Sequence, residues 1–342
     1  MKQALAIFRF LKACAERGEP AALVTLTDVT GSAARGVGEH MAVAASGAAV
    51  GSFSGGCVEA AVIAEAREVL TEGRARTVRY GAGSPYIDIR LPCGGGIDLL
   101  FVPDPDRCEI ERAISILERR MSLVVRLSED GSLAASEAQE NDRTAWRDDV
   151  LHVRHDPPLR LVVLGHGAEP GALLDVACAY GAETMLLSPQ EALVEDARQK
   201  GRPAETLRIL GRSDSLTADP WTAVITLFHD HDWETDLLLQ ACEQNPFFIG
   251  AMGSKRTHAE RRRRLIEAGG TAGQVDRVVG PVGLIHATRD PYTLAISILA
   301  QVVEAYEGIL ADRTNPSMAL NSTHRFVERH ERGNYAAEAL SL

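Results

Sequence analysis

The second half of the chain contains a buried strand that runs directly into a glycine turn. Residues 159–164 are apolar except for one arginine, Gly165 and Gly167 follow at once, and a helical stretch leads to a second strand at residues 184–187. Glycine permits the tight turn and lets the backbone amides at the start of the helix face a phosphate. The pattern predicts the opening βαβ unit of a Rossmann-like, doubly wound parallel sheet.

This glycine turn departs from the dinucleotide fingerprint at two places. The third glycine, Gly171, comes one position later than the fingerprint requires. After the second strand, where an Asp or Glu would bind a ribose, the chain has Ser188, Pro189 and Gln190. Two interpretations therefore stay open: a nucleotide or phosphate site, and a plain turn between strand and helix.

A further strand of the predicted sheet ends in four polar residues. Residues 221–228 form a continuous apolar run, which is followed by His229, Asp230, His231 and Asp232. The carboxyl ends of parallel strands face the ligand crevice. These side chains could bind a divalent metal, transfer protons or only cap the next helix.

The next strand is followed by a second turn rich in glycine and serine. Residues 246–250 are apolar, and Gly253, Ser254 and Lys255 come shortly after them. A turn of this kind ahead of a helix is a phosphate-binding arrangement. The four consecutive arginines of that helix, Arg261–Arg264, predict a solvated helix face.

The first half of the chain predicts a separate α+β domain. An amphipathic helix opens the chain, a buried strand follows at residues 21–27, and a hairpin is expected over residues 41–50. A helix is predicted from Val58 to Leu70. Three more strands are expected, at residues 75–80, 87–91 and 97–102.

Two cysteines of this α+β domain are flanked by glycines. The segment Gly55-Gly56-Cys57 precedes the predicted helix, and Cys93-Gly94-Gly95 lies in a turn between two predicted strands. Unpaired amides and the dipole at a helix N-terminus favour anions and thiolates. The two loops are expected to share one rim and to form a thiol-lined anion site. The alternative is that both cysteines are small buried hydrophobic residues beside structural glycines.

Composition restricts the class of protein. The six cysteines lie far apart, without the spacing of a disulfide framework or a zinc knuckle, which favours reduced thiols and the cytoplasm. A net charge of −11 argues against nonspecific nucleic-acid binding. The N-terminal helix has no cleavable signal, and no apolar run is expected to approach a membrane span.

The boundaries of four segments follow from these patterns. We predict an N-terminal domain over residues 1–106, a connecting segment over 107–158, a Rossmann-like domain over 159–312 and a C-terminal tail over 313–342.

The ordered set of motifs resembles the XdhC/CoxI family of molybdenum-cofactor accessory proteins. The resemblance covers most of residues 1–310. Its motifs are Thr30-Gly31-Ser32-x-x-Arg35, Gly51-x-x-Ser54-Gly55-Gly56-Cys57-Val58-Glu59, Cys93-Gly94-Gly95, Gly165-x-Gly167, Thr226-x-x-His229-Asp230-His231, Ile249-Gly250-x-x-Gly253-Ser254-Lys255 and Pro281-Val282-Gly283-Leu284.

This resemblance implies a chaperone. Such a protein binds the molybdopterin-type cofactor as cargo, presents it for sulfuration and delivers it to a molybdenum hydroxylase of the xanthine dehydrogenase type. A cysteine desulfurase as partner and a homodimeric state are implied in the same way. No membrane or nucleic-acid partner is expected, and a nucleotide in the Rossmann-like domain is a further expectation.

A cofactor with a phosphate and an oxo-molybdenum centre needs amide hydrogens, cations and soft ligands. We expect Cys57 and Cys93 to lie at the metal, Arg35 with the Ser54–Gly56 segment to hold negative charge, and Glu59 to orient the loop. The remaining expected cofactor-binding residues are Gly94, Gly95, Gly165, Gly167, His229, Asp230, His231, Gly253, Ser254 and Lys255.

The chain departs from the family pattern at two places. Ala33-Ala34 stands where the family often has a proline, so the loop that carries Arg35 is expected to be less rigid. Residues 284–291 replace a stretch richer in glycine and acidic residues. There His286 could fill the altered site or simply pack beside an apolar helix.

Two rival classes of enzyme remain open. A pyridine-nucleotide oxidoreductase would use the Rossmann-like half, but the acidic ribose ligand is absent from the sequence. A metal-dependent phosphohydrolase or nucleotidyltransferase would use residues 229–232 with Ser254 and Lys255. Either class leaves the glycine-flanked cysteines without a task.

Overall fold

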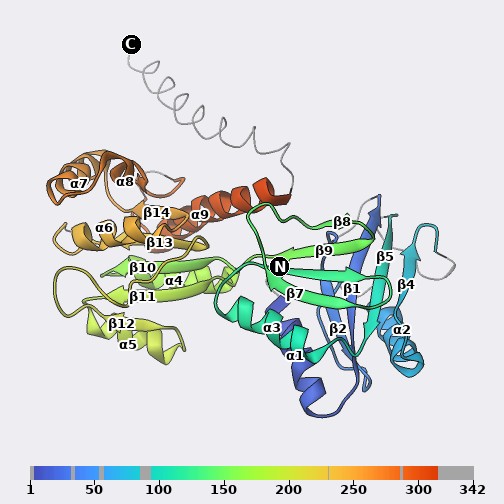
Figure 1. Ribbon diagram of the computed structural model, residues 1–342. Coiled ribbons are helices and arrows are strands. Elements are labelled where there is room, and N and C mark those ends of the chain that lie inside the picture. The colour runs from blue at the N-terminus through green and yellow to red at the C-terminus, as the bar shows by residue number, and fades with distance from the viewer. Residues whose placement is uncertain are drawn as a thin grey trace. The chain divides into compact units, whose positions relative to one another are not determined.

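The computed structural model describes residues 4–31, 35–53, 58–84, 94–229, 231–285 and 288–314 (Figure 1). The chain divides into two compact units, Met1–Pro157 and Pro158–Leu342. The first unit combines antiparallel sheets with helices, and the second is built on a parallel sheet, which confirms the predicted α/β fold class.

The first unit is centred on a five-stranded antiparallel sheet in the order β3-β2-β1-β5-β4. Its strands are β1 (Ala21–Thr30), β2 (His40–Ala44), β3 (Ala49–Val50), β4 (Arg76–Gly81) and β5 (Gly96–Pro103). Alternate residues of β1 face opposite sides of the sheet: Leu23 packs in one core, and Val24 and Leu26 pack in the other. Most residues of β1 are apolar because each face of the strand is buried in a hydrophobic core.

Helices cover the two faces of this sheet. Helix α2 (Glu59–Glu72) lies on one face through Val62, Ala66 and Val69. Helices α1 (Ala4–Glu16) and α3 (Arg107–Glu118) share the core on the other face, and Figure 1 shows these two together, apart from α2.

The connecting segment was predicted over residues 107–158, but residues 107–157 are an integral part of the first unit. They form α3 and a second antiparallel sheet in the order β7-β6-β9-β8. The strands of this sheet are β6 (Leu123–Ser128), β7 (Leu133–Glu137), β8 (Ala145–Arg147) and β9 (Val150–His155). Their inward apolar residues join the same core as α1 and α3. The two-residue turn between β8 and β9 has Asp148 and Asp149 at positive φ, as a tight hairpin requires.

The second unit is a six-stranded parallel sheet in the order β12-β11-β10-β13-β14-β15. Its strands are β10 (Arg160–Gly165), β11 (Glu183–Ser188), β12 (Ala204–Thr206), β13 (Thr222–Leu227), β14 (Phe248–Ala251) and β15 (Val278–Val279). Its helices are α4 (Glu169–Tyr180), α5 (Glu191–Gln199), α6 (Glu234–Gln244), α7 (Lys255–Glu267), α8 (Ala272–Asp276) and α9 (Pro291–Thr314). Strands β10 and β13 are neighbours, so the order of the sheet reverses between them.

Helix α9 contradicts the expectation that no apolar run approaches the length of a membrane span. Residues Pro291–Ala311, with a mean hydropathy of 1.5, are long and apolar enough to cross a membrane by length and composition, and among the described residues no other helix is. Buried α9 residues such as Ile298, Val302 and Tyr306 belong to a core of the parallel-sheet unit, where the helix also packs against α4. The apolar composition is that of a core helix.

A buried pair of histidines in the first unit makes its stability dependent on pH. His40 Nε2 lies 3.0 Å from His155 Nε2, and His40 Nδ1 lies 2.9 Å from Thr25 Oγ1. Burial lowers the pKa of His155 from 6.5 to about 3. Burial, and then the charge of its histidine neighbour, also hold the pKa of His40 well below its usual range.

Both histidines are therefore neutral in the folded chain and protonated in the unfolded chain below pH 6.5. For His155 the stabilising effect of the neutral form is complete above that pH and is lost as the pH falls toward about 3, by about 1.4 kcal/mol per pH unit. His40 acts in the same direction. We expect His155→Leu to flatten this dependence in urea unfolding measured across the range. The exposed His229→Gln is the control, and an equal slope in the parent and His155→Leu would contradict the assignment.

Candidate functional site

Three strands of the first unit end or begin at one edge of its sheet. Thr30, the last residue of β1, is paired with Gly96, the first residue of β5, and Gly96 is also paired with Gly81 at the end of β4. Ala82 N donates to Gly95 O at 2.9 Å, which continues this alignment into the turns. The segments that carry Arg35 and Cys93 therefore leave the sheet from adjacent positions.

The chain that leads toward Cys57 runs toward the same edge. Strand β2 is antiparallel to both β1 and β3, so β3 runs in the direction of β1. Gly51 follows β3 with a φ of 103°, and a Cβ there would lie 2.7 Å from His40 O. Only glycine fits this close approach. The chain after β3 thus points toward the end of the sheet at which β1 ends and β5 begins, although it leaves the sheet level with the middle of β1.

Arg79 ties two of these loops and β5 together through one guanidinium. Its Nη2 donates to Thr30 Oγ1 at 2.8 Å, its Nη1 to Asp98 Oδ2 at 2.9 Å and its Nε to Ala82 O at 2.9 Å. A Cβ at Gly96 would lie 2.9 Å from Arg79 Nη2, so the glycine gives the guanidinium room. The planar fork fixes the bases of the loops after β1 and β4.

Glu59, in the first turn of α2, holds both ends of the loop of residues 54–57. Its Oε1 accepts from Ser52 Oγ at 2.7 Å and from Phe53 N at 3.0 Å, before the loop. Its Oε2 accepts from Val58 N at 3.2 Å, after the loop. One carboxylate therefore links the residues on either side of the segment 54–57. That Glu59 orients this segment stays a prediction.

The structure describes only part of the expected site. Ser54, Gly55, Gly56, Cys57 and Cys93 lie outside the described residues, as do Asp230 and His286. Arg35 is described and is exposed to solvent, and Gly94 is exposed as well.

In the second unit, the glycine turn after β10 packs tightly against β13. A Cβ at Gly165 would lie 2.7 Å from Leu227 O, so a side chain is excluded there. Gly167 has a φ of 93°. The ring centroids of His166 and His229 lie 5.6 Å apart at this point.

A buried ion pair lies beyond the ends of β13 and β14. Glu234 and Arg261 are 1% and 2% exposed, and Arg261 Nε donates to Glu234 Oε1 at 2.9 Å. His231 Nδ1 also contacts Glu234 Oε1, and Arg261 Nη2 donates to Met252 O at 2.6 Å. The pair therefore fastens the loop after β13 to the loop after β14.

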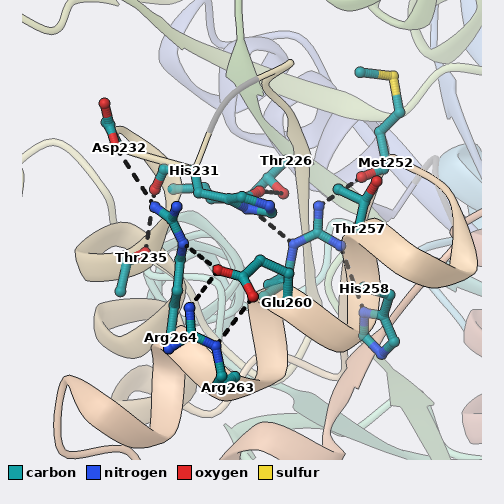
Figure 2. Close-up of polar contacts among 12 residues, drawn as sticks. Thr226, His231, Asp232, Thr235, Met252, Thr257, His258, Glu260, Arg263 and Arg264 are labelled. Atoms are coloured by element: carbon teal, nitrogen blue, oxygen red, sulfur yellow. Dashed lines mark hydrogen bonds and ion pairs between the residues drawn. The ribbon is translucent and has the colours of Figure 1, made fainter.

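The outer part of this cluster is shown in Figure 2, where Asp232 and Glu260 both point toward Arg264. His258 Nδ1 lies 3.4 Å from Arg261 Nη1 and can only accept that hydrogen bond. Burial, and then the charges of Arg261 and Arg262, lower the pKa of His258. This histidine is a neutral partner of the ion pair.

The sequence did not predict this pair, and the prediction that Arg261 lies on a solvated helix face is wrong. Arg261 and Leu265 are the buried residues of α7, so their spacing of four positions marks the inward face. Ser254 caps α7 by accepting from Thr257 N at 3.1 Å, and Lys255 is exposed. Within the described part of the chain, no group of three His, Cys, Asp or Glu side chains could hold a metal ion.

Comparison with known proteins identifies both halves of the chain. Residues 161–302 match the family model of the XdhC Rossmann domain, and residues 14–81 match that of the XdhC and CoxI family. The chain is 36% identical over 297 residues, which is 86% of each protein, to the molybdenum cofactor insertion chaperone PaoD of Escherichia coli.

Two further proteins are similar over most of the chain. A probable xanthine dehydrogenase subunit from Bacillus subtilis is 22% identical, over 86% of this chain and 96% of its own length. A crystal structure of a xanthine dehydrogenase from Bacillus halodurans matches with a TM-score of 0.66 and 24% identity, over 88% of this chain and 95% of that chain. The latter likeness supports the fold.

The Glu59 contacts predict a local loss of order in Glu59→Gln. Glutamine keeps the size of the side chain, but its NH₂ group replaces one of the carboxylate oxygens that now accept hydrogen bonds from backbone N–H groups. We expect faster hydrogen exchange at the Phe53 and Val58 amides and a loss of about 1–3 kcal/mol in the free energy of unfolding. The control is Glu68→Gln on the same helix, whose side chain is 67% exposed. Equal exchange rates in the two variants would refute the assignment.

Proposed function

Because the chain belongs to the XdhC and CoxI family, we propose that it binds the molybdenum cofactor and delivers it to a molybdenum enzyme of the xanthine dehydrogenase type. Two of its relatives support the proposal by name, one as a molybdenum cofactor insertion chaperone and one as a probable xanthine dehydrogenase subunit. The observation that carries it is the sheet edge of the first unit, where Glu59 and Arg79 fix the bases of the loops that bear Arg35, Cys57 and Cys93.

The chemistry of the cargo fits the residues that these loops carry. The cofactor bears a phosphate and an oxo-molybdenum centre held by a dithiolene. Arg35 and the amides of Gly55 and Gly56 would bind negative charge, and the thiolates of Cys57 and Cys93 would lie at the metal end. Arg79 and Glu59 would position these groups without touching the cargo, because the contacts described for them above lie at the bases of the loops.

The partners in this proposal follow from the fate of the cargo. A cysteine desulfurase supplies the sulfur while the chain presents the cofactor, and the enzyme that uses the cofactor then receives it. The chain acts as a homodimer in the cytoplasm. Cys14, Cys108, Cys178 and Cys242 are free thiols in the structure, which agrees with a reducing compartment.

The content of molybdenum and pterin in the purified protein tests this function. The parent from molybdate-fed cells is expected to hold both in comparable amounts, and Cys57→Ala and Cys93→Ala are expected to lose them because a metal ligand is gone. Cys108→Ala and Cys178→Ala are matched controls, since both cysteines are exposed elsewhere in the chain, and they are expected to keep the cofactor.

Two results would count against the proposal. One is a parent without molybdenum or pterin that also fails to bind isolated cofactor in a titration. The other is full cofactor content in both Cys57→Ala and Cys93→Ala, which would remove the thiols from the site.

A further inference from the structure

The glycine turn after β10 is bridged to both neighbouring strands by side chains of the chain itself. On one side, Gly167 N donates to Gln190 Oε1 at 3.1 Å, across to the turn that follows β11. On the other side, Glu169 Oε2 lies 3.5 Å from His229 Nε2, across to the loop that follows β13. These two bridges span both gaps in which a Rossmann-like sheet would receive a ligand.

Gln190 is placed where an adenosine ribose and its phosphate would join the two turns. It is the N-cap residue of α5, yet its side chain makes no capping hydrogen bond there and reaches the β10 turn instead. Its backbone N donates to the buried Ser188 Oγ at 3.1 Å. The Gly167 amide, which would face a pyrophosphate, therefore already has an acceptor in Gln190 Oε1. Ser188, Pro189 and Gln190 at the end of β11 include no acid to accept from a ribose hydroxyl, and the first acid is Glu191 in α5.

Glu169 puts a carboxylate at the start of α4, against the same turn. Its Oε2 would lie 2.9 Å from a Cβ placed on Gly167, so it packs directly on the glycine. The acidic group interacts favourably with the N-terminal end of the helix dipole, which is the position that a pyrophosphate uses. A second anion at this place would meet like-charge repulsion from the carboxylate.

We propose that the Rossmann-like unit binds no dinucleotide at its glycine turn, because Gln190 accepts from the amide that would face the pyrophosphate and Glu169 places a negative charge at the start of α4. The two side chains link the turn after β10 to the turn after β11 and to the loop after β13. The glycines then serve close packing, as the contact of Gly165 with Leu227 O indicates. The nucleotide expected here from the sequence has no place at this turn.

Titration of the full chain with NAD⁺ and NADPH tests this proposal. The parent should show no binding at dinucleotide concentrations up to about 1 mM. The double variant Glu169→Gln/Gln190→Ala should bind with a Kd of about 0.1 mM, because the Gln190 acceptor and the Glu169 charge are both removed. The matched control is Glu191→Gln/Gln199→Ala, which makes the same chemical changes at exposed positions on α5 and should behave as the parent.

Hydrogen exchange at Gly167 provides a readout that needs no ligand. Its amide should be protected in the parent and should exchange faster in Gln190→Ala at unchanged thermal stability. Saturable binding of either dinucleotide by the parent would overturn the proposal. It would equally be overturned by a double variant that folds but gains no affinity, or by equal exchange of the Gly167 amide in the parent and Gln190→Ala.

Discussion

Backbone amides that leave a sheet without a strand partner need another acceptor, and each unit supplies one from a nearby side chain. In the first unit, the Glu59 carboxylate accepts from the amides on both sides of the loop of residues 54–57. In the second unit, Gln190 accepts from Gly167 within the turn itself. In the first unit this requirement fixes the residues on either side of the segment 54–57. In the second unit it occupies the amide of the glycine turn itself.

This difference assigns separate tasks to the two units. In the first unit, Glu59 and Arg79 contact the residues at the bases of the loops, and the proposed function assigns the loop residues to the ligand. Groups that are held in place before binding lose less conformational entropy when the ligand arrives. In the second unit, side chains link the ends of the strands directly, through the Glu234–Arg261 pair and the bridges from Glu169 and Gln190.

Local signals explain which parts of this arrangement could be predicted. The parallel sheet was predictable because an apolar strand, two glycines and a helix follow one another within a few residues. The sheet of residues 123–155 was missed because β8 has only three residues and its turn at Asp148 and Asp149 looks like a polar linker. Arg261 was missed because its partner Glu234 lies far away in the sequence, so a run of four arginines hid one buried cation.

The proposed function requires that the chain passes the molybdenum cofactor to an enzyme, and this transfer can be measured. Cofactor-loaded protein would be mixed with a molybdenum-free enzyme of the xanthine dehydrogenase type, and the enzyme would be isolated for molybdenum content and hydroxylase activity. We expect both to rise as the carrier loses its cofactor, faster than with the same concentration of free cofactor. Cofactor that stays on the loaded protein, or transfer no faster than from solution, would contradict it.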